Sequence, residues 1–152
     1  MKYDVTYSCG HTGTVELYGA GKDRERRLQY LAKTICCDCQ NQQAKDRAAN
    51  AGLPTLQGSE KQVNWAASIR MAFADKAQAI IETTKTNAER AIQAQPADAD
   101  KIIAARDNDL RITTAMTDSI LSGRTSAAWW IDNRGKDALE LMRIEYANKG
   151  GK

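Results

Sequence analysis

Two pairs of side chains that can bind a metal stand near the start of the chain. Cys9 and His11 are separated by one glycine, and Cys36 and Cys39 are separated by two residues. Thiolates and imidazoles are the ligands from which structural zinc sites are built, and ligands this close in sequence can reach one tetrahedral ion. The spacing therefore predicts a closed zinc site made by Cys9, His11, Cys36 and Cys39.

Three other interpretations of these residues are weaker. Disulfides need an oxidising compartment, but Met1 to Asp4 lead into a polar strand and do not resemble a signal peptide, so we expect a cytoplasmic protein with reduced thiols. A redox Cys-x-x-Cys pair belongs in a βαβ setting, which the surrounding sequence lacks. Chance is disfavoured because the only histidine lies two residues from a cysteine. Cys37 is interpreted as a spare thiol, although it could replace Cys36 as a ligand.

The predicted zinc site is structural. A catalytic zinc keeps one position open for water, whereas four protein ligands fill the coordination sphere. The chain has no second histidine for a Ser/His/Asp set, and Gly19-Ala20-Gly21 lacks the later glycines and the lysine of a phosphate-binding loop. The sequence therefore predicts that the protein is not an enzyme.

The elements that must hold the ligands follow from the surrounding pattern. Alternating stretches at about 3–8 and 13–18 predict a β-hairpin with Cys9 and His11 in its turn, where Gly10 permits a tight backbone. Helices are predicted over 22–34 and over 40–51, the second starting at the metal. This arrangement predicts a zinc-ribbon or treble-clef-like module over residues 1–52.

A break and a long helix follow the predicted zinc module. Glycine and proline between residues 53 and 58 predict a linker. Ser59 and Gln62 fit a capping box, and the helix that they begin should end before Pro96. The apolar positions of this helix form one stripe: Trp65, Ile69, Phe73, Ala77, Ile80, Thr84, Ala88 and Ala91.

Two more helices complete the predicted fold. One begins near Asp98 or Asp100 and is closed by Gly123, and the other covers about 127–147. Residues 149–152 are expected to be disordered. The predicted class is α+β, mostly α, in which a helical hairpin or three-helix bundle over 59–148 follows the zinc module.

Composition narrows the classes of function. Aromatic residues make up only 6% of the chain and alanine supplies much of the apolar fraction, so any core is thin. Thin cores on long helices are completed by a partner or a second copy, and we expect a protein partner or a dimer. No apolar run approaches the roughly eighteen residues that span a membrane. A net charge of +3 is too mild to predict nucleic-acid binding by itself.

One local cluster of charge lies at residues 22–27. Four cations there are candidates for phosphate contacts: Lys22, Arg24, Arg26 and Arg27. Asp23 and Glu25 are interleaved with them, which favours a solvated helix face. Nucleic-acid binding through this cluster and the zinc module is the alternative function, and it requires affinity that falls steeply with salt.

Two predicted helical segments contain several tryptophan, arginine and asparagine residues that could bind a partner or a ligand. Six residues are candidates for binding a partner or ligand: Trp65, Arg70, Trp129, Trp130, Asn133 and Arg134. Trp130 and Arg134 lie four residues apart, on one helix face. Tryptophan and arginine are enriched in binding hot spots, and together they also suit a nucleobase and a phosphate. The segments therefore predict a protein contact or a pocket for a nucleotide-like molecule.

The structural alternative for these segments is ordinary helix packing. In that interpretation one tryptophan belongs to the core, the other is half exposed, and Arg134 pairs with Asp132 or Glu60. Arg70 is then an ordinary surface arginine.

Several stretches together resemble one group of proteins. These stretches are YSCGHTG at 7–13, LYG at 17–19, KDRE at 22–25 and GSEKQVNWA at 58–66. They resemble small zinc-ribbon-like proteins encoded by phages and mobile elements of Gram-positive bacteria. The resemblance implies a cytoplasmic, non-enzymatic accessory protein that binds a host or phage protein, such as an inhibitor of a bacterial defence system. It implies no functional residues beyond the presumed metal ligands.

Overall fold

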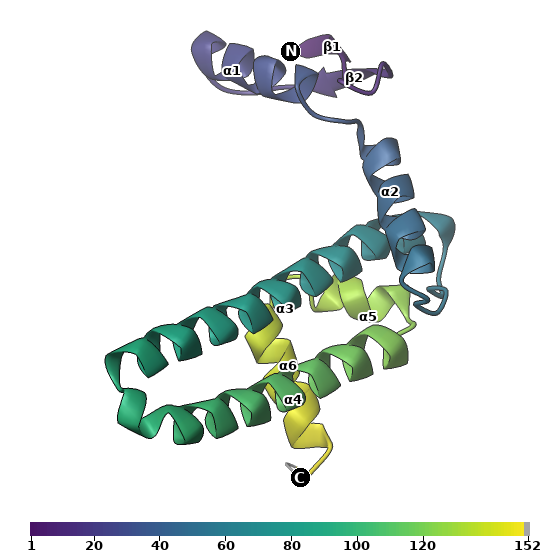
Figure 1. The fold of residues 1–152 in the computed structure, drawn as a ribbon. Helices are drawn as coiled ribbons and strands as arrows, with labels where there is room; N and C mark the ends of the chain where they lie inside the picture. Colours follow the sequence, from purple (N-terminus) through teal and green to yellow (C-terminus); the bar gives the residue numbers. More distant parts are fainter. Residues whose placement is uncertain (151–152) are drawn as a thin grey trace. The chain divides into compact units, whose positions relative to one another are not determined.

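A computed structural model of the chain describes residues 1–150, and it confirms the predicted class, α+β with mostly helix (Figure 1). The chain divides into two compact units, Met1–Ala44 and the part from Lys45 onward. Their boundary falls within helix α2. None of the helices in the described part of the chain combines the length and apolar composition needed to cross a bilayer. The elements are β1 (Lys2–Thr6), β2 (Thr12–Glu16), α1 (Gly21–Ala32), α2 (Cys37–Asn50), α3 (Glu60–Ala94), η1 (Pro96–Asp98), α4 (Ala99–Gly123), α5 (Ala127–Asp132) and α6 (Ala138–Asn148).

The first unit is a β-hairpin with one helix packed on it. Strands β1 and β2 pair antiparallel, and Gly10 in the turn between them has a φ of 82°, which glycine adopts without strain. Nε of Arg24 in α1 donates to the hydroxyl of Tyr3 in β1 at 2.9 Å. The hairpin was therefore predicted correctly, with both strands slightly shorter than expected.

Very little of this first unit is buried. Among its described residues, only Val5, Cys36 and Ala44 fall in the buried class. Tyr30 is 56% exposed, and the guanidinium of Arg27 lies 5.0 Å from the centre of its ring. Apolar burial alone gives this unit almost no core.

The second unit is built on an antiparallel pair of long helices, α3 and α4, which η1 joins (Figure 1). Helices α5 and α6 pack against this pair. Trp130 of α5 is the largest side chain in the resulting core, with only 1% of its surface exposed. Its Nε1 donates to the carbonyl of Arg124 at 2.7 Å, and its ring lies 5.7 Å from that of Phe73. Fully buried Ala66 and Ala77 let neighbouring elements approach α3 closely.

A buried carboxylate links α6 to the end of α4. Glu145 accepts hydrogen bonds from the hydroxyl of Ser119 at 2.7 Å and from Nη2 of Arg124 at 2.8 Å. These two bonds hold the pKa of Glu145 below its usual range. The guanidinium of Arg124 also lies 5.2 Å above the ring of Trp129. The same arginine therefore contacts α5 and α6.

The segment before α3 is packed against the helices. Leu53 and Leu56 contact the core, and Gln57 pairs with the start of α5: its N–H donates to Thr125 at 2.7 Å, and its carbonyl accepts from Ala127 at 2.8 Å. The expected linker at 53–58 is thus part of the second unit. The capping box that follows is present, since Ser59 and Gln62 each accept a hydrogen bond from the other's backbone.

One prediction about the helices was wrong, and another held in position but not in conformation. The expected single helix over 127–147 is two helices, because Asp137 accepts from the N–H of Glu140 at 2.7 Å and starts a new one. Helix α4 does end at Gly123 as predicted, but Gly123 lacks the positive φ that is typical of a closing glycine. A disordered tail was expected over residues 149–152. Within it, the backbone N–H of Lys149 donates to the carbonyl of Glu145 at 3.2 Å, and residues 151–152 lie outside the described residues.

Gly58 provides a test of the packed segment. Its φ is 154°, and an added Cβ would lie 3.0 Å from Cβ of Ala127. Gly58→Ala should therefore lower the free energy of unfolding by about 1–3 kcal/mol. Urea denaturation followed by circular dichroism measures this change. Gly123→Ala is the control, because open space surrounds that position, and it should be neutral or stabilising by up to about 1 kcal/mol. Equal loss in both variants would contradict the packing.

Candidate metal centre

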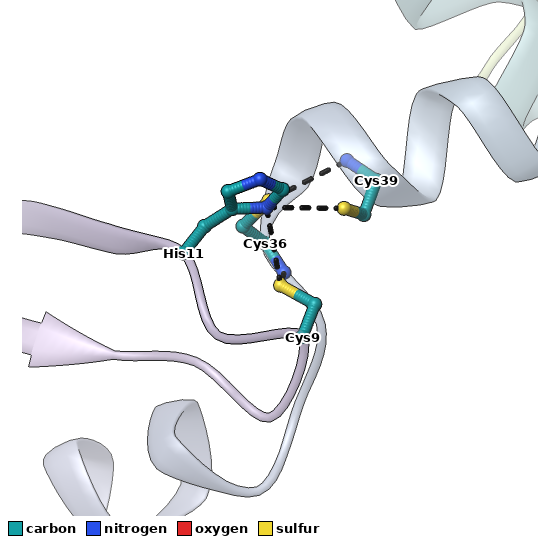
Figure 2. Close-up of side chains that lie close together, drawn as sticks. All are labelled: Cys9, His11, Cys36 and Cys39. Carbon is teal, nitrogen blue, oxygen red and sulfur yellow. Dashed lines mark hydrogen bonds between the residues drawn. The ribbon is translucent and has the colours of Figure 1, made fainter.

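The four predicted ligands come together in the first unit. One ligand atom from each of Cys9, His11, Cys36 and Cys39 lies within 4.8 Å of every other, so the group could hold a metal ion (Figure 2). Nδ1 of His11 is 3.6 Å from Sγ of Cys9, 3.4 Å from Sγ of Cys36 and 3.3 Å from Sγ of Cys39. The hairpin turn supplies the first two residues, Cys36 lies directly before α2, and Cys39 lies in the first turn of α2.

Backbone hydrogen bonds hold the two halves of the centre together. The N–H of Ser8 donates to Thr34 at 2.9 Å, which joins the hairpin turn to the chain before α2. The N–H of Cys36 donates to Sγ of Cys9 at 3.3 Å, and the N–H of Cys39 donates to Sγ of Cys36 at 3.4 Å. Such bonds stabilise sulfur atoms that carry negative charge.

The spacing of the atoms fits a tetrahedral ion. Bonds of about 2.3 Å to sulfur and about 2.0 Å to nitrogen, at a tetrahedral angle, place a sulfur and a nitrogen ligand about 3.5 Å apart. The three distances from His11 to the sulfur atoms run from 3.3 to 3.6 Å. Three thiols and one imidazole are also a donor set typical of structural zinc.

The charges of the thiols favour a bound cation. The N–H groups of Cys36 and His11 lower the pKa of Cys9 to about 6, so this thiol ionises readily without metal. Hydrogen bonding to the sulfur of Cys36, together with desolvation, raises the pKa of Cys39 to about 11. Crowded sulfur atoms therefore resist carrying several negative charges at once, and a divalent cation would remove that resistance.

Cys37 is not part of the cluster. Its side chain is exposed, and its sulfur accepts a hydrogen bond from Nδ2 of Asn41 at 3.5 Å, one turn further along α2. Of the two candidate ligands, Cys36 and Cys37, the cluster therefore contains Cys36.

The predicted aromatic and cationic residues separate into different environments. Trp65 is 50% exposed, although the sequence placed it in the apolar stripe, and the guanidinium of Arg134 lies 5.3 Å from its ring. Among the described residues Arg134 forms no ion pair, neither with Asp132 nor with Glu60. Trp130 is in the core, and Trp129 packs edge-on against it at 5.0 Å.

Arg70 lies apart from Arg134 and is almost completely buried. Its Nη1 donates to the carbonyl of Pro54 at 2.7 Å, and its Nη2 donates to Leu121 in the last turn of α4. Only 1% of Arg70 is exposed, and burial lowers the pKa of its guanidinium. The alternative of an ordinary surface arginine is therefore wrong. A cation at this position compensates the negative end of the α4 dipole.

The cations of α1 are partly engaged within the first unit. Arg24 donates to Tyr3 and to the carbonyl of Gly19, while Arg26 lies 3.8 Å from Asp23. Arg27 covers Tyr30, and Lys22 is exposed. The four residues proposed for phosphate contacts therefore do not form one uncommitted cationic surface.

Two lysines that sequence reasoning missed lie beside Arg134. Lys76 and Lys136 line a cavity of about 130 Å³, together with Asn133 and Arg134. The sequence held one signal for Lys76. It lies three residues after Phe73 in the same predicted helix, so the two side chains are neighbours on the helix surface.

Zinc content tests the centre directly. Native mass spectrometry of the purified chain should show about one zinc ion per chain, and Cys9→Ser and Cys39→Ser should each abolish retention of the ion, because three ligands no longer close the site. Cys37→Ser is the matched control and should retain the metal. Zinc loss from the control but not from the other variants would overturn the ligand assignment.

Comparisons with known proteins add no assignment. Neither the family models, nor the curated proteins, nor the solved structures with which the chain was compared gave a match. Any assignment of function therefore depends on the geometry of the chain itself.

Proposed function

We propose that the chain is a non-enzymatic, zinc-stabilised binding protein whose first unit folds around one structural Zn²⁺. The observation that carries this proposal is the convergence of four ligand atoms from two separate segments within 4.8 Å. Four protein ligands leave no coordination position for a substrate or a catalytic water. This is the reason for proposing a structural role for the metal.

The weak core of the first unit supports the structural role. Val5, Cys36 and Ala44 are its only buried residues among those described, and Cys36 is itself a ligand. Units of this size bury too little apolar surface to be stable alone, and a structural zinc commonly supplies the missing free energy. The metal would join the hairpin turn to the start of α2, the two segments that carry the ligands.

The surface of the first unit supports a protein as the bound partner. Tyr18 and Tyr30 are 78% and 56% exposed, and exposed tyrosines are enriched in protein interfaces. The charges of residues 1–44 nearly balance, which gives little attraction for nucleic acid. Its cations are Lys2, Lys22, Arg24, Arg26, Arg27 and Lys33, and its carboxylates are Asp4, Glu16, Asp23, Glu25 and Asp38. The resemblance noted above suggests a host or phage protein as the partner.

Removal of the metal tests the structural part of the proposal. A strong zinc chelator should abolish amide protection in residues 1–36, because the hairpin loses the contact that closes it. Amides of α3 and α4 should keep their protection, since their core contains no ligand. Hydrogen exchange followed by mass spectrometry measures both regions in one experiment. Re-addition of zinc should restore protection, and unchanged exchange in the hairpin would contradict the proposal.

Capture of partners tests the binding part of the proposal. Zinc-loaded protein should retain a specific host protein that a Tyr18→Ala/Tyr30→Ala variant loses by at least about tenfold, because exposed aromatics act as binding hot spots. Zinc content of the variant confirms that the unit is intact. A matched control is Tyr146→Phe, on α6 in the second unit. Retention of nucleic acid alone, lost with rising salt, would favour the nucleic-acid alternative instead.

A further inference from the structure

A small cationic cavity lies on the second unit, between α3, the residues after α5 and the start of α6. Its volume is about 130 Å³. We propose that this cavity binds a small molecule that carries a phosphate monoester and a compact apolar group. The residues used in the argument are Phe73, Lys76, Trp130, Asn133, Arg134 and Lys136.

The first argument is charge. Lys76, Arg134 and Lys136 all line the cavity, and no carboxylate does. Within residues 1–150 none of the three forms an ion pair. Three like charges around one small volume repel each other, and an anion placed among them would interact favourably with each. The charge arrangement therefore favours a ligand group with more than one negative charge, as a phosphate monoester has.

The second argument is that two of the cations are held in place. Nη1 of Arg134 donates to the carbonyl of Ile131 at 2.7 Å, and its guanidinium lies 5.3 Å from the ring of Trp65. Nζ of Lys136 donates to Oδ1 of Asn133 at 2.9 Å. Each of these bonds uses one of several N–H groups, so donors remain for a ligand. Binding an anion would therefore require less loss of side-chain freedom than at free surface lysines.

The third argument is the apolar wall of the cavity. Phe73 and Trp130 line it and are 5% and 1% exposed, so they belong to the rigid core. Leu141, also buried, lies on the α6 side. The more accessible apolar lining is Ile69, which is half-buried, and Ala72, which is exposed. An inorganic anion would leave that apolar surface in contact with water, whereas an apolar group attached to the phosphate would cover it. A mainly apolar lining with a few cations suits an amphipathic anion.

The carboxylates adjacent in sequence to the two lysines are already engaged, and Asp75, which precedes Lys76, pairs with Arg47. Asp137 follows Lys136, but its Oδ1 accepts from the N–H of Glu140 at the start of α6, and it does not line the cavity. Ala138, the first residue of α6, lines the cavity, but the Asp137 carboxylate caps this helix end, so the positive potential of the cavity comes from its three cationic side chains.

This site is independent of the metal centre. All residues that line the cavity belong to the second unit, and none is a candidate metal ligand. Loss of zinc and loss of anion binding can therefore be observed separately.

The test is calorimetric titration of the zinc-loaded full chain with phenyl phosphate, inorganic phosphate and phenol, all at equal ionic strength. Phenyl phosphate should bind saturably at one site, and at least about tenfold more tightly than either fragment, because it uses both the cations and the apolar wall. A Lys76→Gln/Lys136→Gln variant should weaken it by about tenfold or more, since charge-assisted hydrogen bonds are lost.

Arg90→Gln is the matched control for loss of charge. Arg90 is an exposed cation near the far end of α3, away from the residues that line the cavity, and this variant should bind like the parent. Both lysines are exposed, so circular dichroism should show unchanged helix content in the double variant. No saturable heat with phenyl phosphate would overturn the proposal. Unchanged affinity in the double variant, or equal weakening in the control, would also overturn it.

Discussion

The convergence of four possible metal ligands is the feature around which the first unit is arranged. Three thiols and one imidazole occupy a volume in which no two ligand atoms are more than 4.8 Å apart. Hydrogen bonding to the sulfur of Cys36 and desolvation raise the pKa of Cys39 to about 11, and charge repulsion from Cys36 and Cys9 adds to the rise. A divalent cation reverses the sign of this interaction, because each further thiolate then adds attraction. On the proposal made above, the metal would therefore contribute strongly to holding the hairpin turn and the Cys36–Cys39 segment together.

The second unit depends instead on close packing and on a few buried polar groups. Alanines on α3 allow tight approach, while Trp130 and Phe73 fill the volume that remains. Arg70 and Glu145 are buried charges, but each makes hydrogen bonds that replace water. Both lie where helices end or meet, so the polar groups determine how the elements join and the apolar groups supply the stabilisation.

The parts of the fold that short sequence patterns encode were predictable. The ligand pairs around Cys9 and Cys36, and the capping box at Ser59, depend on spacings of two or three residues, and the structure contains both. Which side chains of α3 face the core was predicted less well. The apolar pattern placed Trp65 in the buried stripe of α3, but Trp65 is 50% exposed and its neighbour Ala66 is buried. A large apolar side chain is no guide where the partner helix requires a small one.

The features that sequence reasoning missed depend on contacts between distant segments. Arg70 is buried because carbonyls of Pro54 and Leu121 meet there, and no local pattern reports that meeting. Lys76 is on α3 and Lys136 lies in the turn between α5 and α6, so only the folded chain places them around one cavity. The break at Asp137 had a local signal, an N-cap residue followed by Glu140, but the longer apolar pattern across it was given more weight.

The backbone pairing of Gln57 with Thr125 and Ala127 also bears on the order of folding. These residues are far apart in the chain, yet the α3–α4 hairpin between them brings both to the same end of the second unit. Forming the pairing before the hairpin would require closing a long flexible loop, which is entropically unfavourable. After the α3–α4 hairpin has formed, the pairing of Gln57 with Thr125 and Ala127 costs little further conformational entropy. We therefore expect the segment before α3 to dock late, so that its contacts govern the rate of unfolding more than the rate of folding.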